Sequence, residues 1–265
     1  MLGSSLPHLA CPIVNSSSSI TGAERVLQVL AALASHGRAM TVKDLLAETS
    51  LPQSTLYRQL VLLKRWGFVS EHGGFYAPGP ISLQLALSFD LNSLLVEASR
   101  EEIAKLSKIS RESIGLVVTV NDQLICLEMV DSDHSLRCSF EKGRTVPLTA
   151  GASAKCLLAF MGDRARAETL DRLFDNDAGG RQAIEMQLQK IHQDGYAISE
   201  GEVDAGVWGV SAPLFRRTGG VVSCCAAITL MAPATRAVGR ETIFTAQTLQ
   251  TSRLISTRLQ GKELR

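Results

Sequence analysis

Residues 20–80 have a hydrophobic pattern that few folds can satisfy. Apolar side chains recur there at three- and four-residue spacing in three consecutive segments, and two short β-prone runs then flank Gly73-Gly74. The first spacing is typical of amphipathic helices, and two β-prone runs around a Gly-Gly pair are typical of a hairpin. Three helices followed by a hairpin predict a winged helix-turn-helix domain over residues 20–80.

The sequence also marks where these helices begin and end. Gly37 suits the left-handed cap of the first helix. Thr41, followed three residues later by Asp44, resembles a capping box at the start of the second. Pro52 suits the first turn of the third helix, because its missing N–H is not needed there.

The third helix has a polar face suited to the major groove of DNA. The N-terminal half of a recognition helix meets base edges, where Arg pairs with guanine and Gln with adenine. Basic residues at the helix end and at the hairpin tip suit phosphate or minor-groove contacts. The predicted DNA-binding residues are Gln53, Ser54, Thr55, Tyr57, Arg58, Lys64, Arg65 and His72.

The positions of the basic residues support DNA binding by the third helix. Between Ile20 and Pro80 there are six Lys or Arg and four Asp or Glu, which gives a net charge of 6 − 4 = +2. Three of the six basic residues lie on the third helix, which has no acidic residue. Double-stranded operator DNA is the expected partner. The alternative is a helical protein-interaction module with a solvated basic face.

The spacing predicts one connecting helix over residues 81–110. Its apolar seam is too rich for a solvated linker. Two interpretations stay open: the seam joins two copies of the chain into a dimer, or it packs on its own domain. Pairing would multiply the affinity of a small DNA-binding module. The seam contains Leu83, Leu85, Leu87, Phe89, Leu91, Leu94, Leu95 and Ala98.

Residues 111–265 alternate between strand-like and helix-like patterns. Hairpins are expected around Asn121-Asp122 and Gly219-Gly220, a further strand over 136–140, and a terminal helix over 235–259. Several hairpins mixed with helices indicate an antiparallel sheet. The expected fold class is α+β: a winged helix-turn-helix, a connecting helix and a C-terminal antiparallel-sheet domain.

Composition excludes several other classes of protein. Of the 265 residues, 45% are hydrophobic, which excludes a disordered chain. No run of 18 apolar residues is present, and the first twenty residues lack the basic start of a secretory signal. We expect a cytoplasmic protein without a membrane partner, in which residues 1–19 form a disordered tail.

Neither a cofactor nor a metal is expected. The six cysteines form no C-x-x-C pair, so we expect reduced thiols, with those of Cys224 and Cys225 on opposite faces of a strand. Glu200, Glu202 and Asp204 have no histidine nearby in the sequence, and we interpret them as solvated acids.

Common catalytic motifs are missing as well. The sequence contains no G-x-S-x-G, P-loop, G-x-G-x-x-G or H-E-x-x-H motif. Ser153-Ala154-Lys155 differs in spacing from S-x-x-K. We therefore expect a protein that is not an enzyme; the alternative is a small-molecule-processing enzyme fused to a helical protein-interaction module.

Three stretches, in this order, resemble the IclR family of transcriptional regulators. The first comprises 20–27, 51–58 and 67–69, the second is 147–155, and the third comprises 195–197, 206–215 and 221–233. The resemblance implies a GAF-like effector domain, dimers that often pair into tetramers, and a small organic ligand, often a carboxylate or an aromatic catabolite. The expected function is a ligand-responsive repressor or activator of a catabolic operon, controlled by a small organic acid.

The resemblance also implies where the effector binds. The family's pocket positions correspond here to Cys138, Val146, Ala152, Ser153, Trp208, Gly209, Thr229 and Met231. Ser153, Thr229 and the N–H groups near Ala154 are expected to hold a carboxylate. Because Gly209 and Met231 lack hydrogen-bonding side chains, and Trp208 offers either an aromatic face or ordinary core, an aromatic acid is expected.

Overall fold

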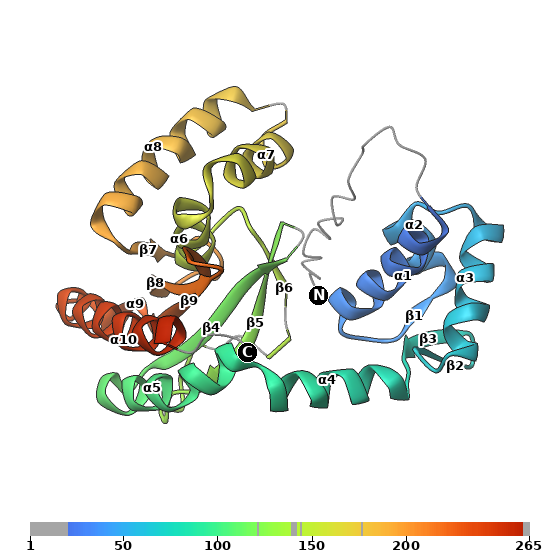
Figure 1. Cartoon of the computed structure of the whole chain (residues 1–265), viewed down its shortest axis with the longest axis horizontal. Helices are drawn as coiled ribbons and strands as arrows, with labels where there is room; N and C mark the ends of the chain where they lie inside the picture. Colours follow the sequence, from blue (N-terminus) through green and yellow to red (C-terminus); the bar gives the residue numbers. More distant parts are fainter. Residues whose placement is uncertain (1–20, 121, 139–141, 144, 176, 262–265) are drawn as a thin grey trace, which may run out of the picture. The chain divides into compact units, whose positions relative to one another are not determined.

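The computed structural model describes residues 21–120, 122–138, 142–143, 145–175 and 177–261. The chain divides into two compact units between Leu91 and Asn92 (Figure 1). The tail expected over residues 1–19, which includes Cys11, lies outside the described residues. None of the described helices is long and apolar enough to cross a membrane.

The first unit is built from three helices and a small sheet. The helices are α1 (Gly22–His36), α2 (Val42–Thr49) and α3 (Gln53–Arg65). The strands β1 (Met40–Thr41), β2 (Val69–His72) and β3 (Phe75–Pro78) form an antiparallel sheet in the order β1-β3-β2 (Figure 1). The predicted helices and hairpin are confirmed, and β1 is a strand that the pattern did not indicate.

Side-chain caps fix the starts of α1 and α2. The Thr41 Oγ1 accepts a hydrogen bond from the Asp44 N–H at 3.2 Å, and the Asp44 carboxylate accepts one from the Thr41 N–H at 2.9 Å. The hydrogen bond from the Thr41 backbone also lowers the pKa of Asp44. The predicted capping box is thus confirmed, and Thr21 and Glu24 form a second one on α1.

The connecting segment consists of two helices rather than one. They are α4 (Pro80–Asn92) and α5 (Leu94–Ser110). Between them Ser93 adopts an extended backbone (φ −75°, ψ 100°), and its Oγ accepts a hydrogen bond from the Val96 N–H at 3.3 Å. Ser93 therefore acts as the N-cap of a new helix, because a serine hydroxyl can satisfy a free N–H at a helix start.

The second unit contains a six-stranded sheet in which every neighbouring pair is antiparallel. Its order is β6-β5-β4-β9-β8-β7. The strands are β4 (Ser113–Val120), β5 (Gln123–Val130), β6 (Thr145–Pro147), β7 (Ala197–Glu200), β8 (Val207–Thr218) and β9 (Val221–Pro233). The strand expected over 136–140 is wrong for residues 136–138, which are irregular; residues 139 and 140 lie outside the described part.

Helices cover both faces of this sheet (Figure 1). The helices α5 and α10 (Glu241–Gly261) pack on one face, and α6 (Ala152–Phe160) packs on the other beside α7 (Asp163–Leu173) and α8 (Ala178–Asp194). The expected terminal helix is divided into α9 (Ala234–Ala237) and α10. Each face has its own hydrophobic core. This α+β arrangement agrees with the predicted fold class.

The described cysteines are free thiols. Cys224 packs in the core beneath α6, whereas Cys225 packs in the core beneath α5 and α10, so the two thiols face opposite sides as predicted. Burial raises the pKa of Cys126 to about 11 and that of Cys224 to about 12. Thiols with such pKa values are poor nucleophiles at neutral pH.

Candidate functional site

The N-terminal half of α3 presents most of the predicted recognition residues to solvent. Gln53, Ser54, Tyr57 and Arg58 are exposed. Arg58 forms no ion pair with any described residue. An exposed helix face with an unpaired arginine is suited to reading base edges.

Thr55 does not belong to that face. Its side chain is buried, as are those of Leu56, Leu60 and Leu63. Because residues separated by four or eight positions share a helix face, Thr55 lies on the same face as Leu63. The prediction that Thr55 contacts DNA is wrong.

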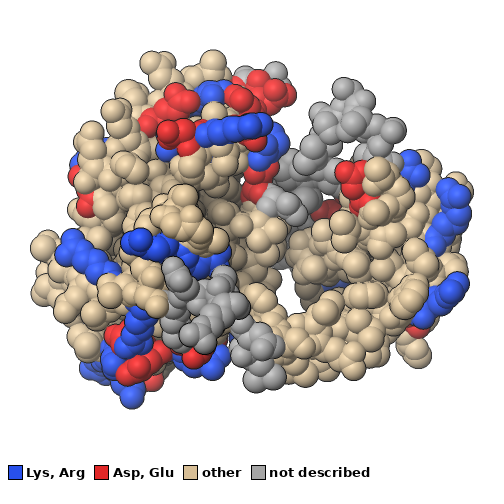
Figure 2. All heavy atoms as spheres, viewed as in Figure 1, with Lys and Arg blue, Asp and Glu red and all other residues tan. Residues whose placement is uncertain are grey.

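The end of α3 is tied to the hairpin. The Lys64 ammonium forms an ion pair with the Glu71 carboxylate of β2. This hydrogen bond raises the pKa of Lys64 and lowers that of Glu71. Lys64 is therefore already paired rather than free for a phosphate. Arg65 and His72 are exposed, and Lys and Arg side chains lie along the edge of the unit that α3 occupies (Figure 2).

Replacing Glu71 by glutamine is expected to strengthen DNA binding at low salt. The substitution releases Lys64 for a phosphate, and one more phosphate contact makes the slope of log K against log[salt] steeper by about 0.9. Fluorescence anisotropy of a promoter duplex over a salt series measures both effects. Glu48→Gln, which removes one negative charge from α2, is the control; equal changes in the two variants would contradict the specific role of Lys64.

The second unit contains a pocket of about 410 Å³. It opens between the start of α6, the segment 199–207 and the strands β5, β6, β8 and β9. Seven of the eight residues predicted for the effector line it: Cys138, Val146, Ala152, Ser153, Gly209, Thr229 and Met231.

Trp208, the eighth, lies on the opposite face of the sheet. Its side chain is 4% exposed and packs in the core with Phe244 of α10, with ring centroids 6.0 Å apart. Successive side chains of a strand point to opposite faces, so Gly209 faces the pocket and Trp208 cannot. The expectation of an aromatic face from Trp208 is wrong, and the core interpretation is confirmed.

Polar groups at the start of α6 are already engaged. The Gly151 N–H donates to the Glu202 carboxylate at 3.0 Å, and the Ala152 N–H donates to the Ser199 hydroxyl at 2.9 Å. The buried Lys155 ammonium donates to the other oxygen of Glu202 at 2.5 Å. A ligand carboxylate at this helix start would therefore depend on the next two N–H groups, those of Ser153 and Ala154.

Three hydroxyls meet at the wall of the pocket. The Oγ atom of Ser153 lies 2.7 Å from the Oγ1 of Thr229, which lies 2.8 Å from the Oγ of Ser211. Sequence reasoning found Ser153 and Thr229 but missed Ser211, which is completely buried behind them.

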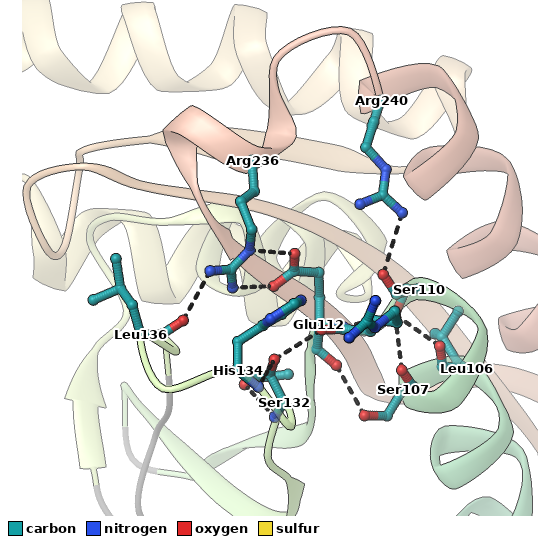
Figure 3. Close-up of polar contacts among 11 residues, drawn as sticks. Leu106, Ser107, Ser110, Glu112, Ser132, His134, Leu136, Arg236 and Arg240 are labelled. Atoms are coloured by element: carbon teal, nitrogen blue, oxygen red, sulfur yellow. Dashed lines mark hydrogen bonds and ion pairs between the residues drawn. The ribbon is translucent and has the colours of Figure 1, made fainter.

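The sequence also did not predict the ion pair between Arg236 and Glu112 beside the pocket (Figure 3). The Arg236 guanidinium of α9 donates to both oxygens of Glu112 at 2.8 and 2.6 Å, and Glu112 is completely buried. These hydrogen bonds raise the pKa of Arg236. A third N–H of Arg236 donates to the Leu136 carbonyl at 2.8 Å.

This cluster joins the pocket wall to the end of α5. Leu136 lines the pocket, whereas Glu112 follows α5 by two residues. The Ser107 hydroxyl of α5 donates to the Glu112 carbonyl at 2.9 Å, and Arg240 donates to the Ser110 carbonyl at 3.3 Å (Figure 3). A shift of the wall at Leu136 therefore has a route of direct contacts to α5.

No group of three or more His, Cys, Asp or Glu side chains in the described ranges is placed to hold a metal ion. Of the three acids Glu200, Glu202 and Asp204, Glu202 is paired with Lys155, as described above.

Models of known protein families match both units of the chain. The model of the IclR helix-turn-helix domain matches residues 22–73, and that of the bacterial transcriptional regulator IclR C-terminal domain matches residues 91–257. The HTH-type transcriptional regulator KdgR of Dickeya chrysanthemi is 28% identical over 216 residues, which cover 77% of this chain and 69% of KdgR.

Solved structures share the fold. An IclR family transcriptional regulator from Brucella abortus has a TM-score of 0.77 at 19% identity, covering 95% of this chain and 99% of that one. An IclR homolog from Microbacterium hydrocarbonoxydans, complexed with 4-hydroxybenzoate, has a TM-score of 0.70 at 22% identity, covering 91% and 100%. The matched domains, in this order and over both units, show that the chain belongs to the IclR family of bacterial transcriptional regulators.

Proposed function

We propose that this regulator binds operator DNA in the cytoplasm through the exposed face of α3 and changes its DNA binding when a small organic acid enters the pocket of the second unit. The observation that carries the ligand response is the pocket wall at Leu136, which Arg236 links to Glu112 at the end of α5. A ligand shifts such an equilibrium only by its different affinities for the two states.

The pocket supports a small organic effector. Its volume of about 410 Å³ lies within the range of roughly 300–1,000 Å³ typical of small-molecule sites. Arg137 is a cation on its wall, and Val146 and Met231 provide apolar surface. The IclR homolog complexed with 4-hydroxybenzoate has the same fold. We propose that the effector is a carboxylic acid of about this size and that the regulated genes act on it.

We further propose that α4 joins two copies of the chain. Leu83 and Leu87 form one exposed apolar stripe, and Leu85 and Phe89 form a second on another side of the helix. A helix with exposed apolar stripes on two sides is more stable in water when other surfaces cover those stripes. A dimer, alone or paired into a tetramer, would also place two copies of α3 on a symmetric operator.

Replacing Arg58 by alanine is expected to weaken operator binding by about 1–3 kcal/mol and to relax the base preference at one position. Arg65→Ala, at the exposed end of α3, is the matched control, because losing a phosphate contact weakens binding to all sequences alike. Binding titrations on the operator and on its single-base variants at fixed salt measure both effects. Unchanged selectivity in the Arg58 variant would contradict its role in base recognition.

The whole proposal is tested with the purified protein and its own promoter region. We expect a salt-sensitive preference for one duplex, altered by an organic acid that is recovered chemically unchanged. Absence of any duplex preference, with and without a panel of acids, would refute the DNA-binding half. Conversion of the acid would instead indicate an enzyme.

A further inference from the structure

A chain of three buried hydroxyls ends at the pocket. Ser153, Thr229 and Ser211 are 5%, 3% and 0% exposed, and of these Ser153 and Thr229 line the pocket. The Ser211 hydroxyl donates to the backbone carbonyl of Ile228 at 3.2 Å. A carbonyl oxygen can only accept a hydrogen bond, so this end of the chain has a fixed direction.

The number of protons on each hydroxyl determines the donor of every hydrogen bond from Ser211 to the pocket. Each hydroxyl has a single proton and can also accept hydrogen bonds. Since Ser211 donates to Ile228, the 2.8 Å contact with Thr229 requires Thr229 to donate to Ser211. The proton of Thr229 is then used, so the 2.7 Å contact requires Ser153 to donate to Thr229. The Ser153 hydroxyl can therefore only accept a hydrogen bond from a ligand, through the lone pairs of its oxygen.

We propose that Ser153 acts as a hydrogen-bond acceptor in the pocket and selects an effector that places a hydroxyl or N–H group against it. A carboxylate or an ether oxygen at this point would face lone pairs and lose its hydrogen bonds with water. Asp204, on the pocket wall, adds to the unfavourable surroundings for an anion near the start of α6, whereas the charge of Glu202 is balanced by its ion pair with Lys155. This inference rests on the proposed function, in which the effector binds in this pocket.

The inference revises the expected position of the carboxylate. Ser153 and Thr229 were expected to donate to it. Because Ser211 donates to the Ile228 carbonyl, Thr229 donates to Ser211 and Ser153 donates to Thr229, so neither proton is directed into the pocket. The carboxylate of an effector then lies in another part of the pocket, where the wall includes Arg137, whose guanidinium also forms an ion pair with Asp131 at 3.3 Å. The chemical class selected is a small hydroxy- or amino-substituted organic acid.

Neutron diffraction from crystals of the deuterated, full-length protein without effector tests the proton order directly. We expect the deuteron of Ser211 on the line to the Ile228 carbonyl, that of Thr229 directed at Ser211, and that of Ser153 directed at Thr229. The reverse order, with a deuteron of Ser153 in the pocket, would overturn the inference without affecting the proposed function.

Ligand selectivity gives a second test, because Thr229→Val removes the acceptor of Ser153 and frees its proton for the pocket. Calorimetry compares 4-hydroxybenzoate with 4-methoxybenzoate, and phenol with anisole. We expect the hydroxyl compound of each pair to bind the unmodified protein about tenfold more tightly, and the preference to be lost or reversed in Thr229→Val. Thr229→Ser, which keeps the chain of hydroxyls, should retain the preference.

The outcomes distinguish the acceptor role of Ser153 from the binding of an effector in this pocket. Equal binding within each pair, or the same preference in Thr229→Val and in the unmodified protein, would overturn the role of Ser153. If none of the four compounds binds, an aromatic effector in this pocket is contradicted, and the neutron result still decides the proton order. Thermal unfolding of each variant checks that the fold is intact.

Discussion

Replacing Arg236 by methionine is expected to lower the free energy of unfolding of the second unit by about 3–5 kcal/mol. The substitution leaves the carboxylate of Glu112, which is 0% exposed, without its bidentate partner. An unpaired buried charge loses its hydration and gains nothing in return. Urea unfolding followed by fluorescence measures the effect, in a Trp66→Phe background so that buried Trp208 provides the signal.

Two comparisons make this result specific. Arg240→Met is the matched control, because Arg240 donates to the Ser110 carbonyl and lies 4.5 Å from the Phe244 ring centroid, contacts worth about 1–2 kcal/mol together. Combining Arg236→Met with Glu112→Met should recover most of the loss, because no buried charge then remains. Equal destabilisation by Arg236→Met and by Arg240→Met would mean that the Glu112 ion pair has no special role.

The second large effect is expected from Leu83→Asp combined with Leu87→Asp. These leucines are 63% and 56% exposed in the single chain, so aspartate at both positions leaves the fold intact. Charges inside the proposed apolar contact between two copies of α4 would separate the two chains. The loss of bivalent binding should weaken operator affinity about 100-fold or more.

Sedimentation and operator titrations test this together. Leu254→Asp is the matched control, since Leu254 is 49% exposed on α10. We expect the control to sediment as the unmodified protein does and to keep its operator affinity. A doubly substituted α4 variant that sedimented as the unmodified protein does would contradict self-association through this helix.

Local patterns predicted the fold well because most of its signals lie within a few residues. The capping box at Thr41, the hairpin at Gly73-Gly74 and the helical spacing of α3 are such signals. The errors at Thr55 and Trp208 are errors of phase, since one position along a helix or strand decides which side a residue faces. The break at Ser93 depends on one cap, which helical spacing alone does not reveal.

The contacts that complete the site join distant parts of the chain. Arg236 and Glu112 are 124 residues apart, and Ser153 and Thr229 are 76 apart. The family resemblance supplied seven of the pocket residues, but no local pattern indicates that Ser211 or Arg236 supports them. Such partners become visible only when the sheet and its helices are assembled.

The cap at Ser93 makes the start of the second unit self-contained. The hydrogen bond that starts α5 joins Ser93 to Val96, so both partners lie on the same side of the boundary after Leu91. A gene fusion made at this boundary would leave the start of α5 complete. The second unit could thus be joined to a different DNA-binding domain, and such fusions would serve as biosensors if the second unit binds the effector proposed above.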